Sequence, residues 1–133
     1  MRIMIDTNVL VSGLLFPDSQ VNTVLLHIMS KHRLVVPSYV LDEFKDVIRR
    51  KFPKQAEQID DLLKKLSYEL AYTPDKMRKD LFAIRDIADY PVLYAAMIEG
   101  VDVLLTGDKD FAAVRVDMPK IMTPRKFLDS EQW

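Results

Sequence analysis

The sequence contains no cysteine, and among its 133 residues it has only two histidines and three glycines. The absence of cysteine excludes disulfides, thiolate zinc sites and cysteine nucleophiles, and it is typical of a reducing compartment. His27 and His32 are the only imidazoles, so a metal cluster built on histidine is not expected. We predict that both histidines are structural or surface residues.

Long apolar runs and an excess of one charge are also missing. The longest apolar stretches have about five or six residues, far short of the roughly 20 that span a bilayer. Asp6 interrupts the first of them before the core of a signal peptide develops. With 19 Lys and Arg against 20 Asp and Glu, the net charge is -1, which excludes a strongly basic nucleic-acid binder. We therefore expect a cytoplasmic protein without membrane contact, in which any nucleic-acid binding comes from a local patch.

Hydrophobic residues make up 49% of the sequence and charged residues 29%. This mixture is too apolar for a disordered chain, and the length is close to that of a typical domain with one buried core. We predict a single domain over residues 1–133.

Short apolar runs alternate with segments of helical periodicity along the whole chain. The runs predict strands over 2–5, 33–36, 69–73, 102–105 and 120–122. The periodic segments predict helices over 20–31, 38–50, 56–66 and 91–99. Such alternation favours a mainly parallel sheet with helices on both faces, that is, a three-layer α/β domain.

Acidic side chains follow the predicted strands or begin the helices after them. These residues are Asp6, Glu43, Asp86, Asp89, Asp108 and Asp110. Parallel sheets bind ligands at the carboxyl ends of their strands, so these carboxylates are expected to meet at one edge. Their repulsion would raise the pKa of at least one of them unless a cation neutralises it. Mg²⁺ and Mn²⁺ prefer carboxylate oxygens and are the simplest neutralisers.

Each of these acids also has a structural interpretation. Glu43 fits a solvated helix face, and Asp86, Asp108 and Asp110 fit helix caps or turns. Asp6 could also merely cap the next turn, but it points more strongly to function, because it stands where parallel sheets present catalytic groups.

Four segments resemble, in order, the motifs of a known family. They are MIDTNVL at 4–10, LDEF at 41–44, RDIAD at 85–89 and VLLTGDKDF at 103–111. Together they are similar to the PIN domain, in particular to the toxin components of toxin-antitoxin systems. The resemblance implies a five-stranded parallel sheet in the order 3-2-1-4-5 and a metal-dependent endoribonuclease. It also implies RNA and an antitoxin protein as partners, and it leaves a homodimer open.

The resemblance assigns site residues one by one. Asp6, Glu43, Asp89 and Asp108 match the acids that bind Mg²⁺ or Mn²⁺ and carry catalysis. Asn8 matches the residue that braces the first loop, Thr106 matches the threonine that supports the site, and Asp86 and Asp110 are further supporting candidates.

Position 90 departs from the family pattern, which commonly has a second acid there. This chain has Tyr90, so Asp89 or Asp86 must supply the third ligand. We predict Asp89, because Pro91 suits the first helical turn and places Asp89 near the N-cap. Tyr90 is then expected to pack or to stack on a base.

Two other functions remain open at this point. A phosphatase-type hydrolase would use Asp6 as its nucleophile, but such enzymes normally have a second acid at the position of Asn8. A catalytically degenerate PIN-like binding module is kept open by Tyr90. A basic stretch could bind RNA phosphates or merely be solvated helix surface; it comprises Arg49, Arg50, Lys51, Lys54, Lys64 and Lys65.

Overall fold

A parallel five-stranded sheet forms the centre of the computed structural model, which describes residues 1–131 except the side chain of Ala112. The strand order is β3-β2-β1-β4-β5, as predicted. The strands are β1 (Arg2–Ile5), β2 (Arg33–Pro37), β3 (Glu69–Ala71), β4 (Val103–Leu105) and β5 (Lys120–Met122). Each pair of neighbouring strands is parallel, so all strands end at the same edge of the sheet.

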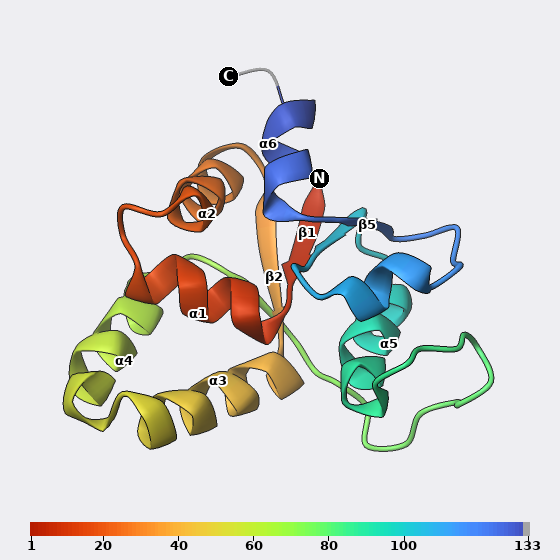
Figure 1. Ribbon diagram of the computed structural model, residues 1–133, viewed down its shortest axis with the longest axis horizontal. Coiled ribbons are helices and arrows are strands. Elements are labelled where there is room, and N and C mark those ends of the chain that lie inside the picture. The colour runs from red at the N-terminus through yellow and green to blue at the C-terminus, as the bar shows by residue number, and fades with distance from the viewer. Residues whose placement is uncertain (132–133) are drawn as a thin grey trace.

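Helices cover both faces of this sheet, which confirms the predicted α/β fold class. They are α1 (Thr7–Leu15), α2 (Gln20–Lys31), α3 (Ser38–Lys51), α4 (Ala56–Lys65), α5 (Tyr90–Glu99) and α6 (Pro124–Ser130). Short 3-10 segments are η1 (Pro53–Gln55), η2 (Ile87–Asp89) and η3 (Lys109–Ala113). Figure 1 shows α1, α2 and α4 to one side of β1 and β2, and α5 to the other.

The strand order explains this division of the helices. From β1 the chain steps outward through β2 to β3, and it then crosses back to β4 and β5 on the other side of β1. Crossovers between parallel strands are almost always right-handed, so reversing the direction of the steps moves the connecting helix to the opposite face. The reversal lies between β1 and β4, where α/β sheets place their binding sites.

The central strands are buried because helices cover them on both sides. Ile3, Met4 and Ile5 of β1 have no exposed surface. Phe44 from α3, Phe111 from η3 and Phe127 from α6 are the largest fully buried side chains. The continuous apolar strands of the sequence therefore correspond to a two-sided core.

Two helices were not predicted from the sequence, α1 and α6. Residues 7–15 are apolar around most of the helix and show little amphipathic pattern, and only the Asp6 cap marks where α1 begins. α6 is seven residues long, with Thr123 as its N-cap. Helices this short are stabilised by tertiary packing, which periodicity does not report. Strand ends also shift slightly: β3 ends at Ala71, and β4 begins at Val103.

In residues 1–131, no single helix is both long and apolar enough to cross a membrane. Helices α1 and α2 together meet the length and composition criteria, but the chain bends by 101° between them.

The contact between α1 and α2 has no space for a side chain at Gly13. A Cβ atom added there would lie 2.1 Å from Leu25 Cδ1 and 3.0 Å from Leu25 Cγ. Leu25 is 1% exposed, so the core around it limits its movement. This glycine thus permits the close approach of the two helices.

We expect Gly13→Ala to destabilise the protein. Overpacking costs about 1 to 3 kcal/mol, which outweighs the gain in helix propensity of at most about 1 kcal/mol. Urea unfolding should show a lower free energy of unfolding with an unchanged m-value. Gly107→Ala is the control, because nothing lies within 4 Å of its added Cβ. Equal stability of both variants and the wild type would contradict close packing at Gly13.

Candidate active site

Asp6 is held at the junction of β1, α1 and β4. Its backbone N–H donates to the carbonyl of Leu105 at 3.2 Å, which extends the pairing of β1 with β4. Oδ1 accepts a hydrogen bond from the backbone of Val9 at 2.9 Å and so caps α1, and Oδ2 accepts one from the Thr106 hydroxyl. The residue is only 6% exposed. The position of this carboxylate is therefore fixed by two strands and a helix start.

The loop after β4 brings two more carboxylates towards Asp6. The Asp108 backbone N–H donates to Thr106 Oγ1 at 3.0 Å, so Thr106 links Asp6 to this loop. Asp108 Oδ1 accepts from the backbone of Asp110 at 2.9 Å and begins η3. Thr106 therefore contacts both the carboxylate of Asp6 and the backbone of Asp108.

Glu43 reaches the same edge from α3. Its Oε1 accepts a hydrogen bond from the Thr7 hydroxyl at 2.7 Å, and its side chain is half-buried. The contact joins the first turn of α1 to α3. Asn8, the expected brace of this loop, is exposed, and the neighbouring Thr7 makes the contact instead.

Asp86, Asp89 and Asp110 form the other half of the site. One carboxylate oxygen from each lies within 4.8 Å of the others. Asp86 is exposed and caps η2 by accepting from the backbone of Ala88 at 3.0 Å. Asp89 Oδ2 is buried and has no hydrogen-bond partner in the described part of the chain. This oxygen is a buried acceptor whose lone pairs are left unused.

Burial and mutual repulsion perturb the acids as expected for a convergent cluster. Burial, followed by repulsion from Asp108, Asp86 and Asp110, raises the pKa of Asp89 to about 7. Burial also raises the pKa of Asp6, helped by Asp108 and Glu43 and opposed by its hydrogen bonds. The two halves of the site therefore share Asp108 as a common neighbour.

Tyr39 lies close enough to Glu43 and Asp89 for both acids to repel its ionised form. Burial, then repulsion from Glu43, Asp89 and Asp86, raises the pKa of the Tyr39 phenol. Its hydroxyl donates to the carbonyl of Ala88 at 3.1 Å and thereby ties α3 to η2, directly before the start of α5. No sequence signal marks Tyr39 as a site residue, because an aromatic residue in a helix usually indicates only packing.

Tyr90 packs in the interior. It is 4% exposed, its hydroxyl donates to the carbonyl of Arg78, and its ring stacks on Phe82 with centroids 4.2 Å apart. Asp89, one residue earlier, faces the carboxylates, as its predicted place at the N-cap required. The structure therefore places Asp89, with Asp86 nearby, at the start of the helix.

The donor chemistry of the site fits a hard divalent cation. The converging groups offer carboxylate and hydroxyl oxygens, and neither histidine lies among them. A cation beside Asp89 would neutralise the cluster and satisfy the unpartnered Oδ2 atom. Without a cation the same carboxylates repel one another. Both the positions of the oxygens and their charge therefore suit a divalent cation.

Positive charge near the site comes from a residue outside the predicted basic stretch. Arg85 Nη1 lies 3.8 Å from Asp110 Oδ1, and the Arg85 side chain is 88% exposed. The predicted stretch lies on the last turns of α3, on η1 and on the end of α4, and all of its residues are exposed. Arg85 therefore places a positive charge beside one of the carboxylates.

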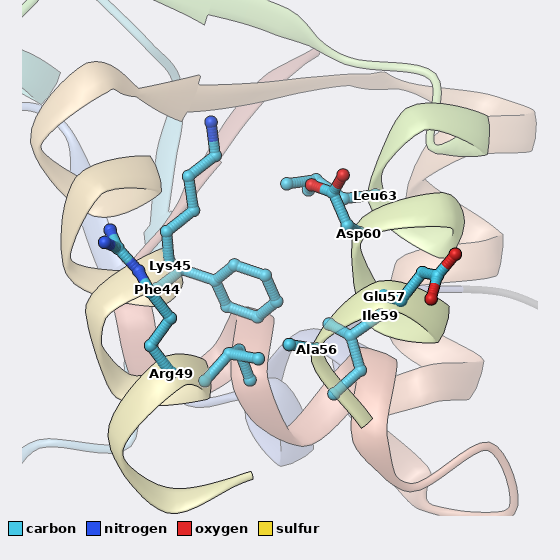
Figure 2. Close-up of a pocket in the computed structure, with 9 residues that line it drawn as sticks. Phe44, Lys45, Arg49, Ala56, Glu57, Ile59, Asp60 and Leu63 are labelled. Carbon is cyan, nitrogen blue, oxygen red and sulfur yellow. The ribbon is translucent and has the colours of Figure 1, made fainter. Parts of the chain in front are cut away.

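An apolar groove between α3 and α4 is separate from these carboxylates (Figure 2). Phe44 points its ring towards α4, and Ile59 and Leu63 complete the apolar wall. Charged side chains lie around it, namely Lys45, Arg49, Glu57 and Asp60. None of the predicted site acids lines this groove. The candidate active site is therefore the group of carboxylates at the carboxyl edge of the sheet.

The fold and the site define a class of protein: a parallel α/β domain with an acidic centre where its strand order reverses. Residues 2–110 match the family described as "PIN domain", and the chain belongs to that family. Among curated proteins, none matches.

Solved structures share the fold at low sequence identity. One is the structure of VapBC2 from Rickettsia felis bound to a DNA fragment from its promoter. Its matching chain is 19% identical, the TM-score is 0.71, and the match covers 92% of this chain and 97% of that chain. VapC20 of Mycobacterium tuberculosis, a sarcin-ricin loop cleaving toxin, is 13% identical with a TM-score of 0.58, covering 84% and 93%.

Asp89 should make the metal-free protein less stable as the pH rises. Its pKa in the folded protein, about 7, lies above the ordinary value, so between about pH 4 and pH 7 the folded state binds a proton that the unfolded state has released. The stability that this proton contributes is fully present below about pH 4 and is lost as the pH rises to 7. In EDTA at pH 8, the free energy of unfolding of Asp89→Asn should therefore exceed that of the wild type by about 1 to 2 kcal/mol after solvent screening. At pH 4 the two should agree.

Denaturant unfolding at both pH values measures this difference, with Asp42→Asn as a matched control. Asp42 is exposed on the same helix as Glu43. A gain for Asp42→Asn equal to that for Asp89→Asn would show that overall charge, and not the cluster, causes the effect.

Proposed function

We propose that this protein is a Mg²⁺- or Mn²⁺-dependent endoribonuclease whose metal ligands are Asp6, Glu43, Asp89 and Asp108. The observation that carries the proposal is the buried, unpartnered Oδ2 atom of Asp89, whose carboxylate clusters with those of Asp86 and Asp110 and is repelled by that of Asp108. A native site that tolerates such crowding among acids is one that gains from binding a cation. In this proposal residues 1–133 act as one domain.

The chain's own residues would position the ligands. Thr106 and the backbone of Val9 hold both oxygens of Asp6, and Thr7 holds Glu43. Each carboxylate oxygen has further lone pairs, so these hydrogen bonds orient the ligands and leave them able to bind metal. The divalent ion, when bound, would supply an activated water and would neutralise charge on the phosphate.

RNA is the proposed substrate. Arg85 is exposed beside Asp110 and is placed to pair with a backbone phosphate near the acids. The exposed basic residues at the end of α3 would bind further phosphates of the same RNA strand. VapC20, which shares the fold, is described as cleaving the sarcin-ricin loop, and this supports RNA over DNA.

We further propose that the protein is the toxin of a toxin-antitoxin pair, with an antitoxin protein as its partner. The support is the PIN family membership and the shared fold with VapBC2 and VapC20, the second of which is described as a toxin.

The other functions considered from the sequence have less support. A nucleophilic Asp6 normally works with a second acid two residues later, and this chain has the exposed Asn8 at that position. A binding module without catalysis is favoured by Tyr90, whose interior packing removes position 90 from the acids. Experiments on metal binding and cleavage separate these alternatives.

Mg²⁺ and Mn²⁺ should raise the melting temperature of the wild type in proportion to ln(1 + [L]/Kd), because they bind only the native state. Asp6→Asn should lose this metal-dependent increment. In EDTA the same variant should be as stable as the wild type or more so, because the substitution relieves repulsion. Equal metal stabilisation of variant and wild type would place the ion elsewhere.

Cleavage of a labelled RNA in Mn²⁺ tests the ligands individually. Asp6→Asn and Asp89→Asn should reduce turnover to the background of the assay, whereas the exposed cap residue Asp86 should show a smaller loss when changed to Asn. Tyr90→Phe loses one hydrogen bond, about 1 kcal/mol, so turnover should stay within about tenfold.

The pattern of losses identifies the true function. Full activity of Asp89→Asn with loss in Asp86→Asn would make Asp86 the third ligand. No metal-dependent cleavage by the wild type, with RNA still bound, would indicate the binding module. A trapped aspartyl-phosphate on Asp6 would indicate the phosphatase-type hydrolase.

A further inference from the structure

His27, His32 and Glu131 form a second polar cluster, distant from the acidic site. His27 lies in the last turns of α2, His32 is the C-cap residue directly before β2, and Glu131 directly follows α6. β2 runs from Arg33 towards the edge that carries the acids. The cluster therefore lies at the opposite end of the strands, where α6 crosses α2 (Figure 1).

Both imidazoles converge on one carboxylate oxygen. His27 Nε2 lies 3.3 Å from Glu131 Oε1, and His32 Nε2 contacts the same atom. The three side chains are only 10%, 14% and 21% exposed. One potential ligand atom from each lies within 4.8 Å of the others. Two imidazole nitrogens and one carboxylate oxygen, all from partly buried side chains, thus lie close together.

The backbone explains how two histidines five positions apart can meet. On a continuous helix they would point about 140° apart. His32 instead leaves the helix with φ -137° and ψ -173°, which returns its ring to His27. The ring centroids are 5.7 Å apart with planes at 65°. Two imidazoles on one tetrahedral ion at about 2.0 to 2.1 Å have centroids roughly 5 Å apart.

The surroundings of the cluster hold this arrangement in place. Phe127 of α6 is 1% exposed and lies between the elements, with its ring centroid 6.1 Å from His27 and 5.9 Å from His32. The amino group of Met1 lies 3.2 Å from His32 Nδ1, the nitrogen that points away from Glu131. Although burial opposes it, hydrogen bonds from His32 and His27 keep the pKa of Glu131 below its ordinary value. The carboxylate is thus ionised in the cluster.

We propose that His27, His32 and Glu131 bind a Zn²⁺ ion that fastens α6 to the end of α2. Two imidazole nitrogens and one carboxylate oxygen are a known zinc donor set, with the fourth position left for water. Binding would require Oε1 to move away from the ring nitrogens, because Glu131 now contacts both of them directly. The site is spatially separate from the acidic centre, which offers only oxygen donors and no imidazole nitrogen among the described residues.

Calorimetric titration of the full, untagged chain with ZnCl₂ at pH 8, in excess MgCl₂ to fill the acidic site, tests the proposal. The wild type should bind one equivalent of Zn²⁺, and its melting temperature should rise with zinc concentration. His27→Gln, His32→Gln and Glu131→Gln should each weaken binding by at least about tenfold. Co²⁺ in place of zinc should give the visible absorption of a four-coordinate nitrogen and oxygen site.

Asp6→Asn is the matched control, because it alters the acidic centre and leaves this cluster intact. It should bind Zn²⁺ as the wild type does, and circular dichroism without metal should show that every variant is folded. Glu131→Gln keeps the size of the side chain, so it separates loss of a ligand from loss of packing. The proposal is overturned if the wild type binds no more zinc than Glu131→Gln, since the cluster is then only an ion pair. Loss of the zinc site in Asp6→Asn would overturn it equally, by placing the ion at the acidic centre.

Discussion

Repulsion between carboxylates at one edge of the sheet is the constraint on which the site depends. Because β1 and β4 are parallel neighbours, their carboxyl ends lie side by side at one edge of the sheet, and the acids that follow them are brought close together. The chain offsets this cost with nearby donors: Thr106 and Val9 hold Asp6, and Thr7 holds Glu43. Asp89 Oδ2 receives no such donor from the described residues, and burial and repulsion raise the pKa of that carboxyl. The uncompensated charge marks where a cation is most favourable.

The same hydrogen bonds that orient the acids also connect the fold. Asp6 caps α1 while it bonds to Thr106 beyond β4, so one carboxylate joins the two central strands and the first helix. Tyr39 joins α3 to η2, directly before the start of α5. Asp6 is therefore held firmly, because moving its carboxylate would break the N-cap of α1 and the hydrogen bond from Thr106. This coupling explains why an acidic centre can be preorganised before a metal ion arrives.

The two ends of the sheet use opposite electrostatics. At the carboxyl edge carboxylates face one another, whereas at the other end His27 and His32 contact the carboxylate of Glu131 directly. The first site suits hard cations through oxygen donors, and the second suits a borderline ion through imidazole nitrogen. Metal binding at one end can therefore be separated chemically from metal binding at the other.

Apolar runs and helical periodicity were enough to predict the sheet and the helices 20–31, 38–50, 56–66 and 91–99, because burial alone imposes those patterns. Resemblance added the strand order and the four acids. Tertiary structure alone decided the rest: α1 and α6 are too short to show a pattern, and Thr7 rather than Asn8 contacts Glu43. The sequence likewise separates His32 from Glu131 by 99 positions, and only the packing of α6 on α2 unites them. Contacts between distant segments depend on three-dimensional geometry, which no local pattern records.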